Sequence, residues 1–112
     1  MTPEGSSEVP VRSGKLVRDG IPAIIQASGK KPIIRVLAGT ELFDALIAKL
    51  DEERAELRAA DESERADELA DIFEVVRALA MMIGLDMPAL EKIAAAKRSQ
   101  RGGFDGGIFL YR

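Results

Sequence analysis

Two consecutive stretches with helical hydrophobic periodicity, joined by a short polar turn, constrain the fold most. The first spans about residues 41–60, and the second follows a turn at residues 61–63 and runs to Met82 or Ile83. In both, apolar residues recur three or four positions apart, which is the spacing of one face of an α-helix. The turn holds Asp61 and Glu64 at the spacing of a capping box. A connection this short predicts an antiparallel helical hairpin.

Capping and helix-breaking residues indicate where the helices in the first part of the chain begin and end. A short helix is expected after Asp19 as N-cap, with Pro22 in its first turn and Gly29 beyond its end. Thr40 is expected to cap the first long helix of the hairpin, because its hydroxyl can accept a hydrogen bond from a free backbone N–H.

A third substantial helix is expected after the hairpin. Gly84 follows the second long helix and should end it. Asp86 and Pro88 are typical of a helix start, and this helix should end near Gln100, before Gly102.

Two short apolar segments have the composition of β-strands. Residues 33–38 are rich in β-branched side chains, and residues 107–111 are strand-like as well. Because neither segment could satisfy its backbone alone, we expect them to pair as a two-stranded antiparallel element. The expected fold class is therefore all-α, with this one small β element.

The domain organisation expected from the sequence is simple. Residues 14–112 form one helical domain, since 112 residues suffice for one modest core and not for two. Residues 1–13 contain Pro, Gly and Ser but no apolar core of a signal peptide, so we expect a flexible tail. No apolar stretch is long enough to cross a bilayer, and a cytoplasmic location without membrane contact is the expectation.

Composition excludes several kinds of chemistry. The chain has no Cys and no His, which excludes disulfides, thiolate metal sites and the commonest general base. Its net charge of −3 argues against a general nucleic-acid binder, which would usually be basic. Catalysis, if present, must therefore use carboxylates, Lys, Arg, hydroxyl groups or a bound metal ion.

Four carboxylates interrupt the apolar faces of the hairpin. With Leu42 set at 0° on the first long helix, Glu53 projects at about 20°, inside the apolar stripe, and Glu56 at about −40°, on its margin. The second helix repeats this arrangement, with Glu68 inside the stripe and Asp71, about 60° away, on the margin. Folding the hairpin should bring the two pairs together.

A metal ion would resolve the conflict that these acids create. Buried like charges raise one another's pKa and cost several kcal/mol unless a cation neutralises them. Hard oxygen ligands without His or Cys favour Mg²⁺, or Mn²⁺ as a substitute. The alternative is that the acids form a solvated face and pair with Arg54, Arg58 or Arg77. The matched arrangement on both helices favours the metal site.

The same residues resemble a known signature. Glu52-Glu53-x-x-Glu56 followed by Glu68-x-x-Asp71 resembles the EExxE…ExxD motif of the all-α NTP pyrophosphohydrolases, the MazG-like superfamily. Two flanking blocks are similar to a branch described as phosphoribosyl-ATP pyrophosphohydrolase-like or as house-cleaning nucleotide pyrophosphatases. These blocks are Lys15-Leu-Val-Arg-Asp19 with Ile21-Pro22, and Lys97-Arg98-x-x-Arg101-Gly102-Gly103-Phe104 with Gly107-Ile108.

The resemblance implies a fold, a reaction and a cofactor. It implies a MazG-like helical bundle that hydrolyses a nucleoside triphosphate to the monophosphate and pyrophosphate with Mg²⁺, and that assembles as a homodimer or homotetramer. The metal ligands would be Glu53, Glu56, Glu68 and Asp71. Glu52 and Glu53 are the candidate catalytic residues, with Glu52 as a base or an additional ligand.

Basic residues would bind the phosphates of the substrate. The candidates are Lys15, Arg18, Lys97 and Arg101. For Lys97 and Arg101, favourable interaction with a helix C-terminus is an alternative. Three functions stay open on these grounds: hydrolysis of non-canonical or excess nucleotides, hydrolysis of phosphoribosyl-ATP in histidine biosynthesis, and a non-enzymatic helical interaction module.

Overall fold

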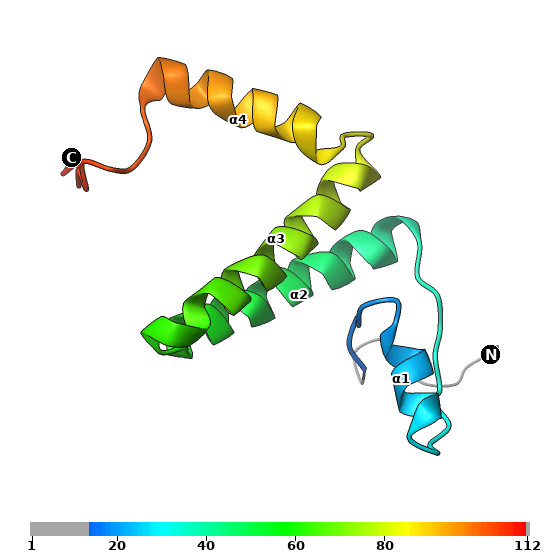
Figure 1. Cartoon of the computed structure of the whole chain (residues 1–112). Coiled ribbons are helices and arrows are strands. Elements are labelled where there is room, and N and C mark those ends of the chain that lie inside the picture. Colours follow the sequence, from blue (N-terminus) through cyan, green and yellow to red (C-terminus); the bar gives the residue numbers. More distant parts are fainter. Residues whose placement is uncertain (1–13, 112) are drawn as a thin grey trace. The chain divides into compact units, whose positions relative to one another are not determined.

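The computed structural model describes residues 14–111, and this part of the chain is all-helical (Figure 1). The elements are α1 (Ile21–Ala27), α2 (Gly39–Ala59), the short 3₁₀ helix η2 (Glu62–Glu64), α3 (Arg65–Met82) and α4 (Met87–Arg101). The expected all-α fold class is confirmed. The expected flexible tail, residues 1–13, lies outside the described residues.

The described chain divides into two compact units, and the boundary falls within α3. The first unit ends at Val75 and contains α1, α2, η2 and the first part of α3. The second unit begins at Val76 and contains the end of α3, α4 and the C-terminal segment. No helix between residues 14 and 111 is both long and apolar enough to cross a membrane.

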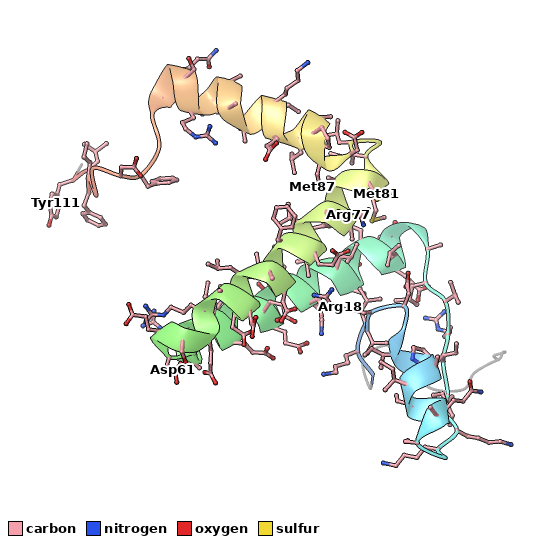
Figure 2. The ribbon with its side chains drawn as sticks, viewed as in Figure 1. Arg18, Asp61, Arg77, Met81, Met87 and Tyr111 are labelled. Carbon is pink, nitrogen blue, oxygen red and sulfur yellow. The ribbon has the colours of Figure 1, made fainter. Side chains whose placement is uncertain are left out.

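The predicted hairpin is present in the first unit, where α2 and the beginning of α3 run side by side in opposite directions (Figure 1). The turn is held by the predicted capping box at Asp61, which Figure 2 labels. The Asp61 side chain accepts hydrogen bonds from the backbone N–H groups of Ser63 and Glu64 at 3.1 and 3.2 Å, and the Glu64 carboxylate accepts one from Asp61 N–H at 3.4 Å. These bonds satisfy donors that a helix start leaves unpaired.

The hairpin buries only the centre of its apolar stripes. Leu46 on α2 and Val75 on α3 are buried, with 5% and 7% of their surfaces exposed. Residues toward the edge of the stripes stay open, and Phe43 and Phe73 are about half exposed. The interface therefore positions residues on α2 opposite residues on α3 and encloses only a few side chains.

The predicted β element is wrong, since the structure assigns no strand to residues 33–38 or 107–111. Both segments are largely exposed, with Val36 at 87% and Ile108 at 90%. β-Branched side chains favour an extended backbone, but a strand also needs a partner for its N–H and C=O groups. No inter-strand hydrogen bonds form in the described part of either segment.

Two predicted N-caps are also wrong. Gly20, and not Asp19, is the N-cap of α1, and Ala38 precedes α2, so Thr40 lies inside the first turn. Within the described residues, no side chain caps either helix. A side-chain cap contributes only about 1 kcal/mol, so the path of the incoming chain can move a helix start by one or two residues.

The start and end signals of α4 are confirmed. The Asp86 side chain accepts a hydrogen bond from Ala89 N–H at 2.9 Å, and Pro88 lies in the first turn. The helix ends at Arg101, one residue beyond the expected Gln100. Gly102 then adopts a φ of 83°, a conformation that residues with a Cβ rarely adopt.

Candidate metal centre

Glu53 is the one buried charged residue in the described part of the chain. It lies on α2 with 5% of its surface exposed, on the same face as the buried Leu46 two turns earlier. Its Oε2 atom is 3.5 Å from the Lys49 ammonium one turn earlier. Its Oε1 atom is buried and accepts no hydrogen bond from any described residue. A buried carboxylate oxygen without a partner is costly in the ionised form, and a bound cation or a proton would relieve that cost.

Three of the four predicted metal ligands come together at this point. Glu53 and Glu56 from α2 and Glu68 from α3 each offer a carboxylate oxygen, and these oxygens lie within 4.8 Å of one another. Glu68 is partly buried, and its Oε1 atom also lacks a hydrogen-bond partner among the described groups. Glu56 is exposed, as expected for a residue on the margin of the stripe.

The surroundings of Glu53 and Glu68 disfavour the ionised forms of these two carboxyl groups. The pKa of Glu53 is raised above the ordinary value of 4.5, first by burial and then by the negative charges of Glu56 and Asp71, against the opposing effect of Lys49. The pKa of Glu68 is raised by burial and by the charges of Glu56, Asp71 and Glu53. Two carboxyl groups with raised pKa values in one cluster are characteristic of functional sites.

The remaining predicted ligand has a different partner. Asp71 Oδ1 accepts a hydrogen bond of 2.6 Å from the Arg18 guanidinium, and both side chains are partly exposed. Figure 2 shows Arg18, from the segment before α1, directed toward the hairpin. Asp71 is not among the three residues whose oxygens converge, although its charge raises the pKa of both Glu53 and Glu68. It therefore lies next to the cluster and not within it.

Glu52, the candidate base, precedes Glu53 on α2 and shares the partner Lys49 with it. Its carboxylate is 3.4 Å from Lys49 Nζ and 3.7 Å from Lys15 Nζ, and about a third of the side chain is exposed. Glu52 is thus more accessible than Glu53, and two ammonium groups neighbour it. In the first unit the structure places two predicted phosphate-binding residues, Lys15 and Arg18, beside predicted site acids.

Lys49 is a site residue that the sequence interpretation missed. Its side chain is 19% exposed, and its ammonium group pairs with both Glu52 and Glu53. The signal was available, since Lys49 projects at about −20° on the helical wheel, 40° from Glu53 and on the margin of the apolar stripe that also carries Glu56. A Lys four residues before a buried Glu on the same side of a helix predicts an intrahelical ion pair.

Lys97 and Arg101, the other two predicted phosphate-binding residues, lie near the C-terminal end of α4 in the second unit. Both are exposed. Arg101 also lies where a cation interacts favourably with the helix C-terminus. Their role as phosphate ligands stays a prediction.

The donor set fits a hard divalent cation. It consists of carboxylate oxygens alone, two of them buried and without a hydrogen-bond partner among the described residues. Mg²⁺, Mn²⁺ and Ca²⁺ prefer such ligands, whereas Zn²⁺ and Cu²⁺ sites usually include His or Cys. Exposed acidic groups commonly cluster without an ion. The burial of Glu53 distinguishes this cluster from an exposed one.

Comparison with known proteins gives one clear relative. Over 52 residues, which are 46% of this chain, the sequence is 60% identical to an uncharacterized protein of Mycolicibacterium smegmatis. The match spans about half the length of that relative, at 53%. No family model matches the chain, and no solved structure matches it.

Proposed function

We propose that the protein is a Mg²⁺-dependent nucleotide pyrophosphohydrolase, which hydrolyses a nucleoside triphosphate to the monophosphate and pyrophosphate. The observation that carries this proposal is Glu53. It is a buried carboxylate with an unpartnered oxygen, in a cluster with Glu56 and Glu68. The resemblance of the acidic residues to the EExxE…ExxD signature supplies the reaction class.

The proposed reaction follows from the charges at the site. A triphosphate carries several negative charges and would be repelled by the carboxylates alone, so binding requires cations. Glu53, Glu56 and Glu68 would hold Mg²⁺, with Asp71 beside them. When bound, the ion would neutralise phosphate oxygens and orient the phosphate that is attacked. Lys15 and Arg18 supply positive charge from the same unit.

The carboxylates have separate tasks in this proposal. Water attacks one phosphorus of the phosphoanhydride, a P–O bond to the leaving group breaks, and the proton of the water must pass to a base. Glu52 is suited to accept it, because it is partly exposed and precedes Glu53 on α2. Lys49 holds Glu52 and Glu53 in position through its two ion pairs.

The proposed substrates are non-canonical or excess nucleoside triphosphates, consistent with a house-cleaning enzyme. Phosphoribosyl-ATP is the alternative substrate that the same resemblance supports. A screen for pyrophosphate release should include canonical nucleotides, damaged nucleotides and phosphoribosyl-ATP, each with Mg²⁺. We expect turnover of at least one substrate by the wild type and by Glu91→Gln, an exposed control, and none by Glu53→Gln. No turnover of any nucleotide by wild type would favour a non-enzymatic interaction module.

We also propose that the chain acts as a homodimer or homotetramer. Support comes from the apolar side chains that the hairpin leaves open. Phe43 and Ile47 lie one turn apart on α2 and are 47% and 38% exposed, and Leu69 and Phe73 on α3 are 53% and 55% exposed. Exposed apolar residues at helical spacing on both members of a hairpin suit association with another helical surface.

A further inference from the structure

The segment that precedes α1 contacts both helices of the hairpin through two ion pairs. Lys15 Nζ lies 3.7 Å from the Glu52 carboxylate on α2, and Arg18 Nη2 lies 2.6 Å from Asp71 Oδ1 on α3. Arg18 and Asp71 are 53 positions apart in the sequence, so this pair is a tertiary contact and not a product of helical spacing. Figure 2 shows Arg18 reaching the hairpin from this segment.

The contact between Arg18 and Asp71 is short but easily exchanged. A guanidinium–carboxylate distance of 2.6 Å indicates a charge-assisted hydrogen bond. The two side chains are nevertheless 58% and 40% exposed. Exposed ion pairs contribute little net stability, because solvent and salt screen them and two side chains must be held in one geometry. Another cation or anion can therefore replace either partner at low cost.

Asp71 lies next to the acidic cluster and acts on it electrostatically while its side chain pairs with Arg18. It is three residues after Glu68 on α3, and its charge raises the pKa of both Glu53 and Glu68. A cation held by the cluster would therefore attract Asp71 as well. A divalent cation at the cluster would then compete with Arg18 for the Asp71 carboxylate.

We propose that Arg18 exchanges partners: it pairs with Asp71 until a divalent cation takes that carboxylate, and the released guanidinium then binds the phosphate of the substrate. This inference rests on the proposed function and adds an order of events to it. Substrate phosphates suit the released Arg18, because a guanidinium can donate two parallel hydrogen bonds to a phosphate. In this role Arg18 is a binding residue whose availability depends on the metal.

The exchange predicts opposite effects of one substitution on two ligands. In Arg18→Gln, Mg²⁺ should bind about two- to fivefold more tightly than in wild type, because the competitor for Asp71 is gone. Inorganic pyrophosphate, titrated at a fixed free Mg²⁺ concentration, should bind more weakly in the same variant. Isothermal titration calorimetry measures both affinities without requiring turnover.

Arg35→Gln is the matched control. Arg35 also forms a 2.7 Å ion pair between partly exposed side chains, with Glu41 at the start of α2. Loss of this pair removes the same charge from the same unit but leaves Asp71 untouched. Both affinities should stay within twofold of wild type.

Hydrogen exchange of a peptide covering residues 14–20 should also become faster when wild type is saturated with Mg²⁺.

The outcomes separate this inference from the proposed function. If Mg²⁺ binds to wild type and not to Glu53→Gln, while Arg18→Gln binds it no more tightly than wild type, the metal site stands and the exchange is refuted. Unchanged pyrophosphate affinity in Arg18→Gln also refutes the exchange. If wild type binds no divalent cation, both the exchange and the proposed function fail.

Discussion

Neutralising Glu53 should stabilise the protein when no divalent cation is bound. One oxygen of its carboxylate lies within 4.8 Å of one oxygen from each of two other acids, and the Lys49 ammonium is 3.5 Å from its Oε2 atom. With an effective dielectric constant of about 20, each like charge at this distance from Glu53 opposes its ionisation by about 3 kcal/mol. The ammonium of Lys49 offsets approximately one such interaction.

The remaining repulsion gives the size of the effect. After screening and relaxation of the side chains, Glu53→Gln should stabilise the fold by about 1–2 kcal/mol in EDTA. For a domain of this size that gain corresponds to a rise in Tm of roughly 5–10 °C. Glu91→Gln, on the exposed surface of α4, should change Tm by no more than about 2 °C.

Addition of Mg²⁺ should raise the Tm of wild type above that of Glu53→Gln. A ligand that binds only the folded state stabilises it by about 2.7 kcal/mol at a concentration of 100 times its Kd. Differential scanning calorimetry should therefore show a rise in Tm with Mg²⁺ for wild type and for Glu91→Gln, and no rise for Glu53→Gln. The reasoning is refuted if Glu53→Gln melts below wild type in EDTA or keeps the full response to Mg²⁺.

Three further predictions test other parts of the structure. The pKa of Glu53 is higher in the folded protein than its ordinary value of 4.5. Protonation of this carboxyl group therefore stabilises the fold at pH values below 4.5, and the stabilisation is lost as the pH rises through the raised pKa. In urea unfolding with EDTA, the free energy of unfolding of Glu53→Gln should therefore exceed that of wild type by an amount that grows with pH. A difference that does not change with pH would contradict the raised pKa of Glu53. Asp61→Ala removes the capping box and should cost about 1 kcal/mol in urea unfolding, whereas an unchanged midpoint would mean that the turn is held by other contacts. Phe73→Asp should reduce the mass of the protein in light scattering from that of an oligomer to that of a monomer. Equal masses for the variant and wild type would show that Phe73 is not part of a subunit interface.

Local signals in the sequence predicted the hairpin well. The 3.6-residue periodicity of residues 41–60 and the short turn after them left few alternatives to two antiparallel helices. The capping box at Asp61 depends on side chains three residues apart, so sequence spacing determines it directly. The cap at Asp86 has the same local origin.

Helical projection also predicted the most informative feature of the site. Glu53 projected into an apolar stripe, and the structure buries it there. Glu56 projected onto the margin and is exposed. These outcomes follow from the geometry of one helix and the side that faces its neighbour. The metal that such a cluster holds depends on more than residue positions and stays a proposal.

The errors concern features that depend on the rest of the fold. A β-strand exists only if another strand pairs with it, and the apolar composition of residues 33–38 and 107–111 could not establish a partner. The pair between Arg18 and Asp71 joins residues 53 positions apart, beyond the reach of any periodicity argument. The ion pair between Lys49 and Glu53 is different, because it follows from helical spacing alone and the sequence was sufficient to predict it.

The most direct test of the central claim, that the cluster of Glu53, Glu56 and Glu68 binds a divalent cation, is a titration with Mn²⁺ monitored by electron paramagnetic resonance. Mn²⁺ accepts the same oxygen ligands as Mg²⁺, and the signal of the free ion decreases on binding. We predict saturable binding to wild type that Mg²⁺ competes away, and loss of that binding in Glu53→Gln and Glu68→Gln but not in Glu91→Gln. Equal binding by all four proteins, or no binding by wild type, would contradict the account.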